Sequence, residues 1–161
     1  MDNPLELIIS MFDTPAQADR ALKNLKSATN KDLFQIKDAA VIEKDADGHV
    51  HLDDDQDVSA GEGTLFGAVT GALVGLLGGP VGAVVGAVAG TATGGVSAAL
   101  LDMGFSNDDL QELQASLPNN SSALVLLVEH TWVEPLVRQL ETQKGRLYRN
   151  ELNPKVVGQY R

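Results

Sequence analysis

The chain has 161 residues, the size of one compact domain with an appended element, so a two-domain enzyme is not expected. Its 12 basic and 22 acidic residues give a net charge of -10, a field that repels nucleic acid and anionic membrane surfaces. The absence of cysteine excludes disulfides, thiolate metal sites and cysteine nucleophiles. The first residues lack the basic region of a signal peptide, which favours a cytoplasmic location.

The charged residues are segregated along the chain. A window of 39 residues, from Gly63 to Leu101, contains no charged residue and holds 11 of the 16 glycines. The chain is therefore a charged globular part interrupted by an apolar segment that is rich in glycine.

The sequence before this window predicts a strand, a helix and a hairpin. The apolar run that opens the chain ends at Pro15, which suits a first helical turn, and apolar residues then recur at helical spacing. Further along, Asp47-Gly48 is a favoured hairpin turn. The predicted elements are a strand at 5–12, a helix at 16–28, an extended run at 34–42 and a return strand at 49–52.

The sequence after the window predicts two more helices and two strands. Ser106 or Asn107 can cap a helix that ends before Pro118, and an unbroken apolar run then suits the centre of a sheet. Gly145 stops the following helix. The predicted elements are a helix at 106–117, a strand at 123–128, a helix at 131–144 and a strand at 146–152.

This order of elements predicts an α+β fold. Without the apolar segment, the order is that of the split βαβ, or ferredoxin-like, arrangement. We therefore predict a ferredoxin-like domain interrupted by an apolar glycine-zipper helical hairpin. The domain would comprise 1–58 and 105–152, the hairpin 59–104 and a tail 153–161.

The apolar segment carries two runs of glycines spaced four residues apart, with Gly78-Gly79-Pro80 between them. In a helix this spacing places the glycines on one stripe, where a second backbone can approach closely. Because each glycine costs a helix roughly 1 kcal/mol relative to alanine, the stripes need partners. The predicted helix-packing and oligomerisation residues are Gly63, Gly67, Gly71, Gly75, Gly82, Gly86, Gly90 and Gly94.

Two settings suit a hairpin whose helices are apolar on all sides. One is a membrane, for which the 81–101 arm spans about 31 Å but the 64–77 arm only about 21 Å. The other is a soluble homo-oligomer whose hairpins meet in an apolar chamber, open to a lipophilic guest such as a quinone or lipid. The acidic flanks disfavour simple insertion, since residues 43–62 hold eight acids and one base. We predict a non-enzymatic, self-associating membrane-associated protein on the cytoplasmic side of the inner membrane, with the soluble assembly as the alternative.

No residue pattern predicts catalysis, a cofactor or nucleic-acid binding. His49, His51 and Asp53 alternate along one strand and could hold a metal ion, but Asp45-Ala46-Asp47-Gly48 departs from a calcium-binding loop. A solvated hairpin with an acidic linker is the favoured interpretation, so no metal site is predicted. His130 has no visible partner and suits a surface or capping role.

An aromatic and basic patch near the end of the chain is a further candidate surface. It would consist of Trp132, Tyr148, Arg146 and Arg149, within a region where residues 144–161 hold five bases and one acid. This region could touch lipid headgroups or pair with the acidic 53–57 segment of a neighbouring copy. Core and rim packing is the more ordinary role for these aromatic side chains.

Several stretches of the chain resemble a known family. They are LIISMFDTPAQADRAL, KDAAVIEKDADGHVHL, the long zipper and DDLQELQASLPNNSSALVLLVE. Together they resemble the bacterial DUF1269 family, which is often described as predicted membrane proteins of unknown function. The resemblance implies a ferredoxin-like domain with a glycine-zipper insert, and it brings no established activity or catalytic residue.

Overall fold

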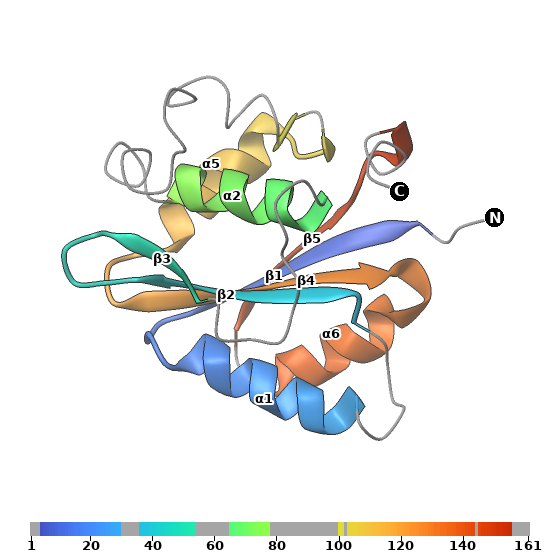
Figure 1. The fold of residues 1–161 in the computed structure, drawn as a ribbon, viewed down its shortest axis with the longest axis horizontal. Helices are drawn as coiled ribbons and strands as arrows, with labels where there is room; N and C mark the ends of the chain where they lie inside the picture. The colour runs from blue at the N-terminus through green and yellow to red at the C-terminus, as the bar shows by residue number, and fades with distance from the viewer. Residues whose placement is uncertain are drawn as a thin grey trace.

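The computed structural model describes residues 4–29, 36–53, 65–77, 100–101, 103–143 and 145–155, and its centre is an antiparallel sheet (Figure 1). The sheet has five strands in the order β3-β2-β4-β1-β5. The strands are β1 (Leu5–Phe12), β2 (Asp38–Lys44), β3 (Val50–Asp53), β4 (Ser121–Glu129) and β5 (Arg146–Glu151).

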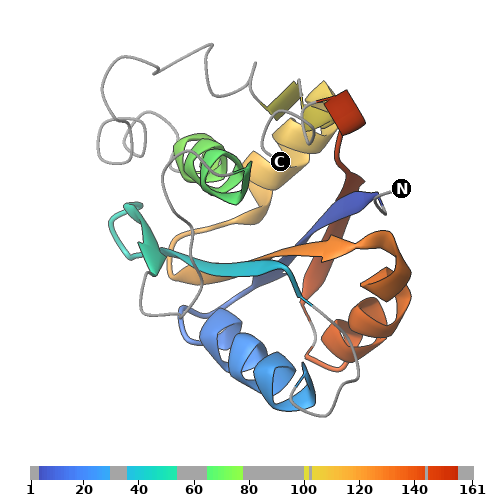
Figure 2. The same cartoon turned by 45° about the vertical axis from the view of Figure 1, so that its right-hand side comes forward.

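Helices cover both faces of this sheet. Figures 1 and 2 show α1 (Gln17–Thr29) and α6 (Val133–Glu141) on one face, and α2 (Leu65–Leu77) and α5 (Asn107–Ser116) on the other. A 3-10 turn, η1 (His130–Trp132), joins β4 to α6. The described part of the chain is therefore a three-layer arrangement with the sheet in the middle.

Strands β1 and β4 consist mostly of apolar residues, and both of their faces are buried. In β1, Leu7 and Ile9 enter the core beneath α2 and α5, whereas Ile8 and Phe12 enter the core beneath α1 and α6. Strand β4 alternates in the same way, and Leu7 pairs with Leu127 in the β1–β4 register. Side chains of a strand alternate between faces, so an unbroken apolar run feeds both cores at once.

The local turn and capping predictions are confirmed. Ser106 caps α5 by accepting a hydrogen bond from the N–H of Asp109, and the Asp109 carboxylate accepts one from the N–H of Ser106. Between β2 and β3, the N–H of Asp45 donates to the carbonyl of His49 at 2.9 Å. Gly48 takes a φ of 87°, a left-handed conformation that glycine adopts without strain.

The predicted fold class, a ferredoxin-like domain interrupted by an apolar glycine-zipper helical hairpin, is wrong. The residues that the structure describes form a five-stranded antiparallel sheet with short helices, and they contain no apolar helical hairpin. Helix α2, predicted as the first arm of the hairpin, has 13 residues and lies on the sheet. The predicted second arm falls outside the described residues, except for Leu100 and Leu101.

The physical reason lies in the second face of the sheet. A split βαβ unit supplies four strands and two helices, whereas here both faces of the central strands carry apolar side chains that need a cover. Helices α2 and α5 provide that cover, and β3 adds an edge strand. A helix that is apolar on every side therefore satisfies part of its burial inside its own chain.

Candidate functional site

Helix α2 carries the predicted packing glycines that the structure describes, so its environment defines the candidate site. Val69 and Leu73 point into the core, and both are 0% exposed. At its end, the Lys44 ammonium of β2 donates a hydrogen bond to the carbonyl of Leu77 at 3.3 Å. This contact satisfies a C-terminal carbonyl and places a positive charge at the negative end of the helix dipole.

The glycine face of α2 is turned away from this core. Gly71 is exposed, and a Cβ built on it would meet no atom of the described residues within 4 Å. Gly75, one turn further on, is half-buried. Gly67 also lies in α2, but the structure does not describe its surroundings. The other predicted packing glycines lie outside the described residues: Gly63, Gly82, Gly86, Gly90 and Gly94. The structure thus shows open space beside one glycine of the predicted stripe.

The β2–β3 hairpin gathers a second group of polar side chains. His51 Nε2 lies 3.1 Å from Asp45 Oδ2, and His49 Nδ1 lies 3.6 Å from the same oxygen. The contact with His51 is the main reason that the pKa of the Asp45 carboxyl lies below its ordinary value of 3.8. The backbone N–H groups of His49 and Asp47 contribute in the same direction, each donating to Asp45 Oδ1 at 2.9 Å.

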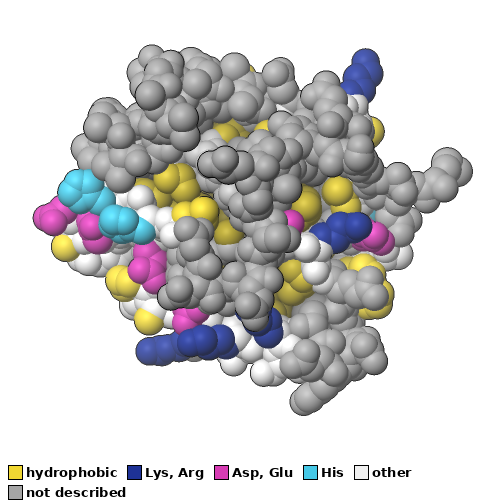
Figure 3. Space-filling model, in the orientation of Figure 1, with side chains coloured by type: hydrophobic (Ala, Val, Ile, Leu, Met, Phe, Trp, Pro, Cys, Tyr) yellow, Lys and Arg dark blue, Asp and Glu magenta, His cyan; other side chains and the backbone are white. Residues whose placement is uncertain are grey.

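The sequence prediction for this hairpin named Asp53 and missed Asp45. A two-residue spacing puts His49, His51 and Asp53 on one side of an extended strand, which was the signal used. The turn instead brings Asp45 back across the hairpin toward both histidines. The position of the Asp-Gly turn in the sequence was the signal that could have indicated this contact. Figure 3 shows two histidine side chains beside acidic ones at the left, where Figure 1 has this hairpin.

A third group surrounds a buried carboxylate that sequence reasoning missed. Glu6 of β1 is only 5% exposed, and its Oε2 lies 2.6 Å from Nδ1 of His130. Arg149 donates to Glu6 Oε1 at 3.5 Å and to Glu134 Oε1 at 3.2 Å. An acid within the apolar run of β1 was the available signal, but its partners lie far along the chain. These contacts tie together β1, η1, β5 and α6.

The predicted aromatic and basic patch is not brought together. Trp132 packs against the core beneath α1 and α6, whereas Tyr148 packs against the core on the other face of the sheet. Arg146 pairs with Asp13 at 2.9 Å, so its charge is engaged elsewhere. These side chains serve the core and its rim.

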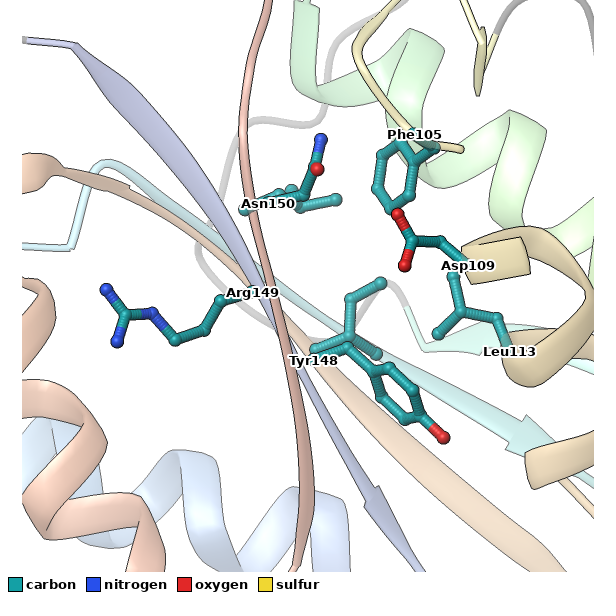
Figure 4. Close-up of a pocket in the computed structure, with 8 residues that line it drawn as sticks. Phe105, Asp109, Leu113, Tyr148, Arg149 and Asn150 are labelled. Carbon is teal, nitrogen blue, oxygen red and sulfur yellow. The ribbon is translucent and has the colours of Figure 1, made fainter. Parts of the chain in front are cut away.

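A small pocket opens between α5 and β5, with a cavity volume of about 30 Å³. Figure 4 shows Asp109 and Tyr148 pointing to the same side of β5 as Phe105, while Arg149 points to the opposite side. Ligand pockets usually enclose about 300 to 1,000 Å³, so this one lies below that range. Its only carboxylate, Asp109, already caps α5. The pocket has no acid–base or nucleophilic pair among its lining residues: Leu7, Ile9, Phe105, Asp109, Leu113, Tyr148, Arg149 and Asn150.

The helices that the structure describes include none with the length and apolar character needed to cross a membrane.

Comparison with known proteins gives a match to a protein family. A family model described as "Protein of unknown function (DUF1269)" matches residues 64–159, from the beginning of α2 to beyond β5. No curated protein matches the chain. No solved structure matches it either. Since the matched segment covers more than half of the sequence, the chain belongs to the DUF1269 family.

Proposed function

We propose that this protein is a non-enzymatic, self-associating protein whose glycine-zipper segment mediates contacts between copies. The observation that carries the proposal is the open space beside Gly71 on α2. A solvent-facing glycine lowers the stability of a helix by roughly 1 kcal/mol relative to alanine, and it makes no contact within the chain that would offset this loss. A second helix lying against that face would return the cost through close backbone packing.

The orientation of α2 supports this role. Leu73 and Leu77 anchor the helix to its own sheet, so the glycine face is held in a fixed direction. A rigid helix surface loses less conformational entropy on association than a flexible segment does. The glycines of α2 therefore serve as a contact surface in this proposal, and not as a linker.

The test is particle mass in solution, measured by light scattering in buffer or detergent. Gly71→Leu adds a large side chain where two backbones would meet, at a position where a Cβ meets no atom of the described residues within 4 Å. We expect its assemblies to shrink by at least half relative to the wild type. The double variant Gly71→Leu/Gly86→Leu extends the test to the second glycine run and should dissociate further.

Two controls separate contact from fold. Gln114→Leu places the same side chain on an exposed position of α5, in the same helical layer, and should keep the wild-type mass. Gly71→Ala raises helix propensity with little bulk and should keep the assembly at least partly intact. A Gly71→Leu protein with unchanged mass would remove the basis of the proposal.

The lack of cysteine allows a second readout of the same contact. Gly71→Cys introduces the only thiol in the chain, and two stripes packed face to face would bring two such thiols into disulfide range. We expect a covalent dimer on mild oxidation of Gly71→Cys, and a much slower one from Gln114→Cys. Equal rates for the two variants would argue against the α2 contact.

For the setting of this association we propose the cytoplasmic side of the inner membrane. The supporting observation is the window of 39 uncharged residues, which is more than a chain of this size buries easily. Sedimentation with membranes and resistance to carbonate extraction are the expected results. One discrete large species, obtained without detergent, would instead favour a soluble homo-oligomer enclosing an apolar chamber for a lipophilic guest.

A further inference from the structure

We propose that Asp45, His49 and His51 of the β2–β3 hairpin form a binding site for Zn²⁺. Imidazole nitrogens and carboxylate oxygens are the donors that Zn²⁺ accepts in proteins without cysteine. The three side chains come from one short stretch of chain on either side of a tight turn. This site is separate from the glycine face of α2 and goes beyond the proposed self-association.

The spacing of the donor atoms fits a tetrahedral ion. Bonds of about 2.0 to 2.1 Å to the metal place neighbouring donors about 3.3 Å apart in a tetrahedron. Asp45 Oδ2 lies 3.1 Å from His51 Nε2 and 3.6 Å from His49 Nδ1, on either side of that value. Binding the ion would also require the two imidazoles to turn toward each other around this oxygen.

The carboxylate of Asp45 is oriented before any ion arrives. Its Oδ1 accepts hydrogen bonds from the N–H groups of Asp47 and His49, which leaves Oδ2 directed at the two imidazoles. Groups that hydrogen-bond to a ligand fix its direction and strengthen binding. Folding of the hairpin already orders this carboxylate, so zinc binding does not have to bear the entropy cost of ordering it.

The turn itself is held by the loop that precedes β4. The Asn119 amide donates to the carbonyl of Ala46 at 3.0 Å, and the N–H of Asn120 donates to the carbonyl of Asp45 at 3.3 Å. These contacts join the hairpin tip to the strand at the centre of the sheet. The turn that carries the metal-binding side chains is therefore held in place by hydrogen bonds to a neighbouring loop.

The surrounding charge favours a cation. One carboxylate oxygen of Asp47 and the donor atoms of Asp45 and His49 lie within 4.8 Å of one another, so Asp47 adds negative charge beside the site. Glu43 stands opposite His51 in the β2–β3 register. With a net charge of -10, the whole molecule raises the local concentration of cations.

The experiment is an isothermal titration of the full chain with zinc chloride at neutral pH. We expect one saturable site per chain, with an affinity at least about 10-fold lower in Asp45→Asn and in His51→Gln. In the wild type, zinc should shift the backbone NMR signals of residues 45–51 selectively. This second measurement locates the site without any variant and so holds even if one of them unfolds.

Asp53→Asn is the matched control. It removes a carboxylate two residues from His51 that is not part of the proposed donor set, and it should bind zinc like the wild type. The proposal fails if zinc shifts no signals in residues 45–51. It also fails if folded Asp45→Asn and His51→Gln proteins bind zinc as tightly as the wild type does.

Discussion

Ser10 is completely buried in β1, and its Oγ is the one buried side-chain polar atom without a hydrogen-bond partner in the described residues. Gly145, at the turn into β5, lies directly against it. A Cβ on Gly145 would overlap Ser10 Oγ and stand 2.9 Å from Phe12 Cε1. The glycine is therefore required by close approach, because the space for a side chain is already filled.

We expect Gly145→Ala to lower the free energy of unfolding by about 1 to 3 kcal/mol, the usual cost of overpacking a core. Ser10→Ala alone should raise it, since an unpaired buried hydroxyl is removed. In the double variant part of the loss should be recovered, with a coupling of at least about 0.5 kcal/mol. Urea denaturation measures all three, and strictly additive effects would contradict the contact.

The ionisation of Asp45 predicts how the stability of the protein depends on pH. Its pKa is lowered in the folded protein, so its ionised form adds stability above the unfolded value of 3.8, and this contribution is lost as the pH falls through the folded pKa. NMR titration of the carboxyl carbon should show the low pKa directly. His51→Gln removes the main cause and should return the pKa toward 3.8; an unchanged titration would exclude His51 as the cause.

At the scale of elements, a stability measurement can test whether α2 packs on the sheet as a core helix or stands free as the arm of a hairpin. Leu73 is 0% exposed, so Leu73→Ala should lower the free energy of unfolding by about 2 to 5 kcal/mol. Leu101, which is 39% exposed, offers a matched control, and Leu101→Ala should change stability by no more than about 0.5 kcal/mol. Equal and small effects in denaturation would mean that α2 does not pack on the sheet in solution.

Local signals predicted the elements that depend on neighbours in sequence. Strand β4 follows from its unbroken apolar run, α5 from its Ser106 cap, and the β2–β3 hairpin from Asp47-Gly48. In each of these, the residues that define the element lie within a few positions of one another. Periodicity and capping chemistry are sufficient there.

Contacts between distant parts of the chain escaped prediction. A helix such as α2, apolar on all sides, has no polar face to show which side meets a sheet, so its place in the core was not evident. The partners of Glu6 are His130 and Arg149, which only the strand order brings together. The Asp45–His51 contact depends on how the hairpin folds back, which spacing along one strand does not express.

At the scale of the whole molecule, the net charge of -10 opposes association of identical copies. Salt shortens the range of this repulsion from about 10 Å at 0.1 M to about 3 Å at 1 M. We expect the assembled fraction to grow as sodium chloride is raised. Light scattering across a salt series measures this fraction.

Sucrose is the control for that series, because it strengthens apolar burial without screening charge. A smaller effect of sucrose would assign the change to repulsion between copies. If the assemblies shrink as salt rises, attraction between the basic 144–161 region and the acidic 53–57 segment would be the dominant contact, and the zipper would be secondary.

The register of the sheet also has a consequence for the order in which the molecule forms. Strand β1 pairs only with β4 and β5 in the described sheet, with Leu5 opposite Glu129, so the first strand to be synthesised waits for the last two. Long-range pairings of this kind form slowly. During synthesis α2 leaves the ribosome after β2 and β3 but before α5 and β4, which complete the core that it joins. For that interval it is open to other copies, to a bilayer or to a chaperone, and the competition between these partners and the sheet is settled while the chain is still growing.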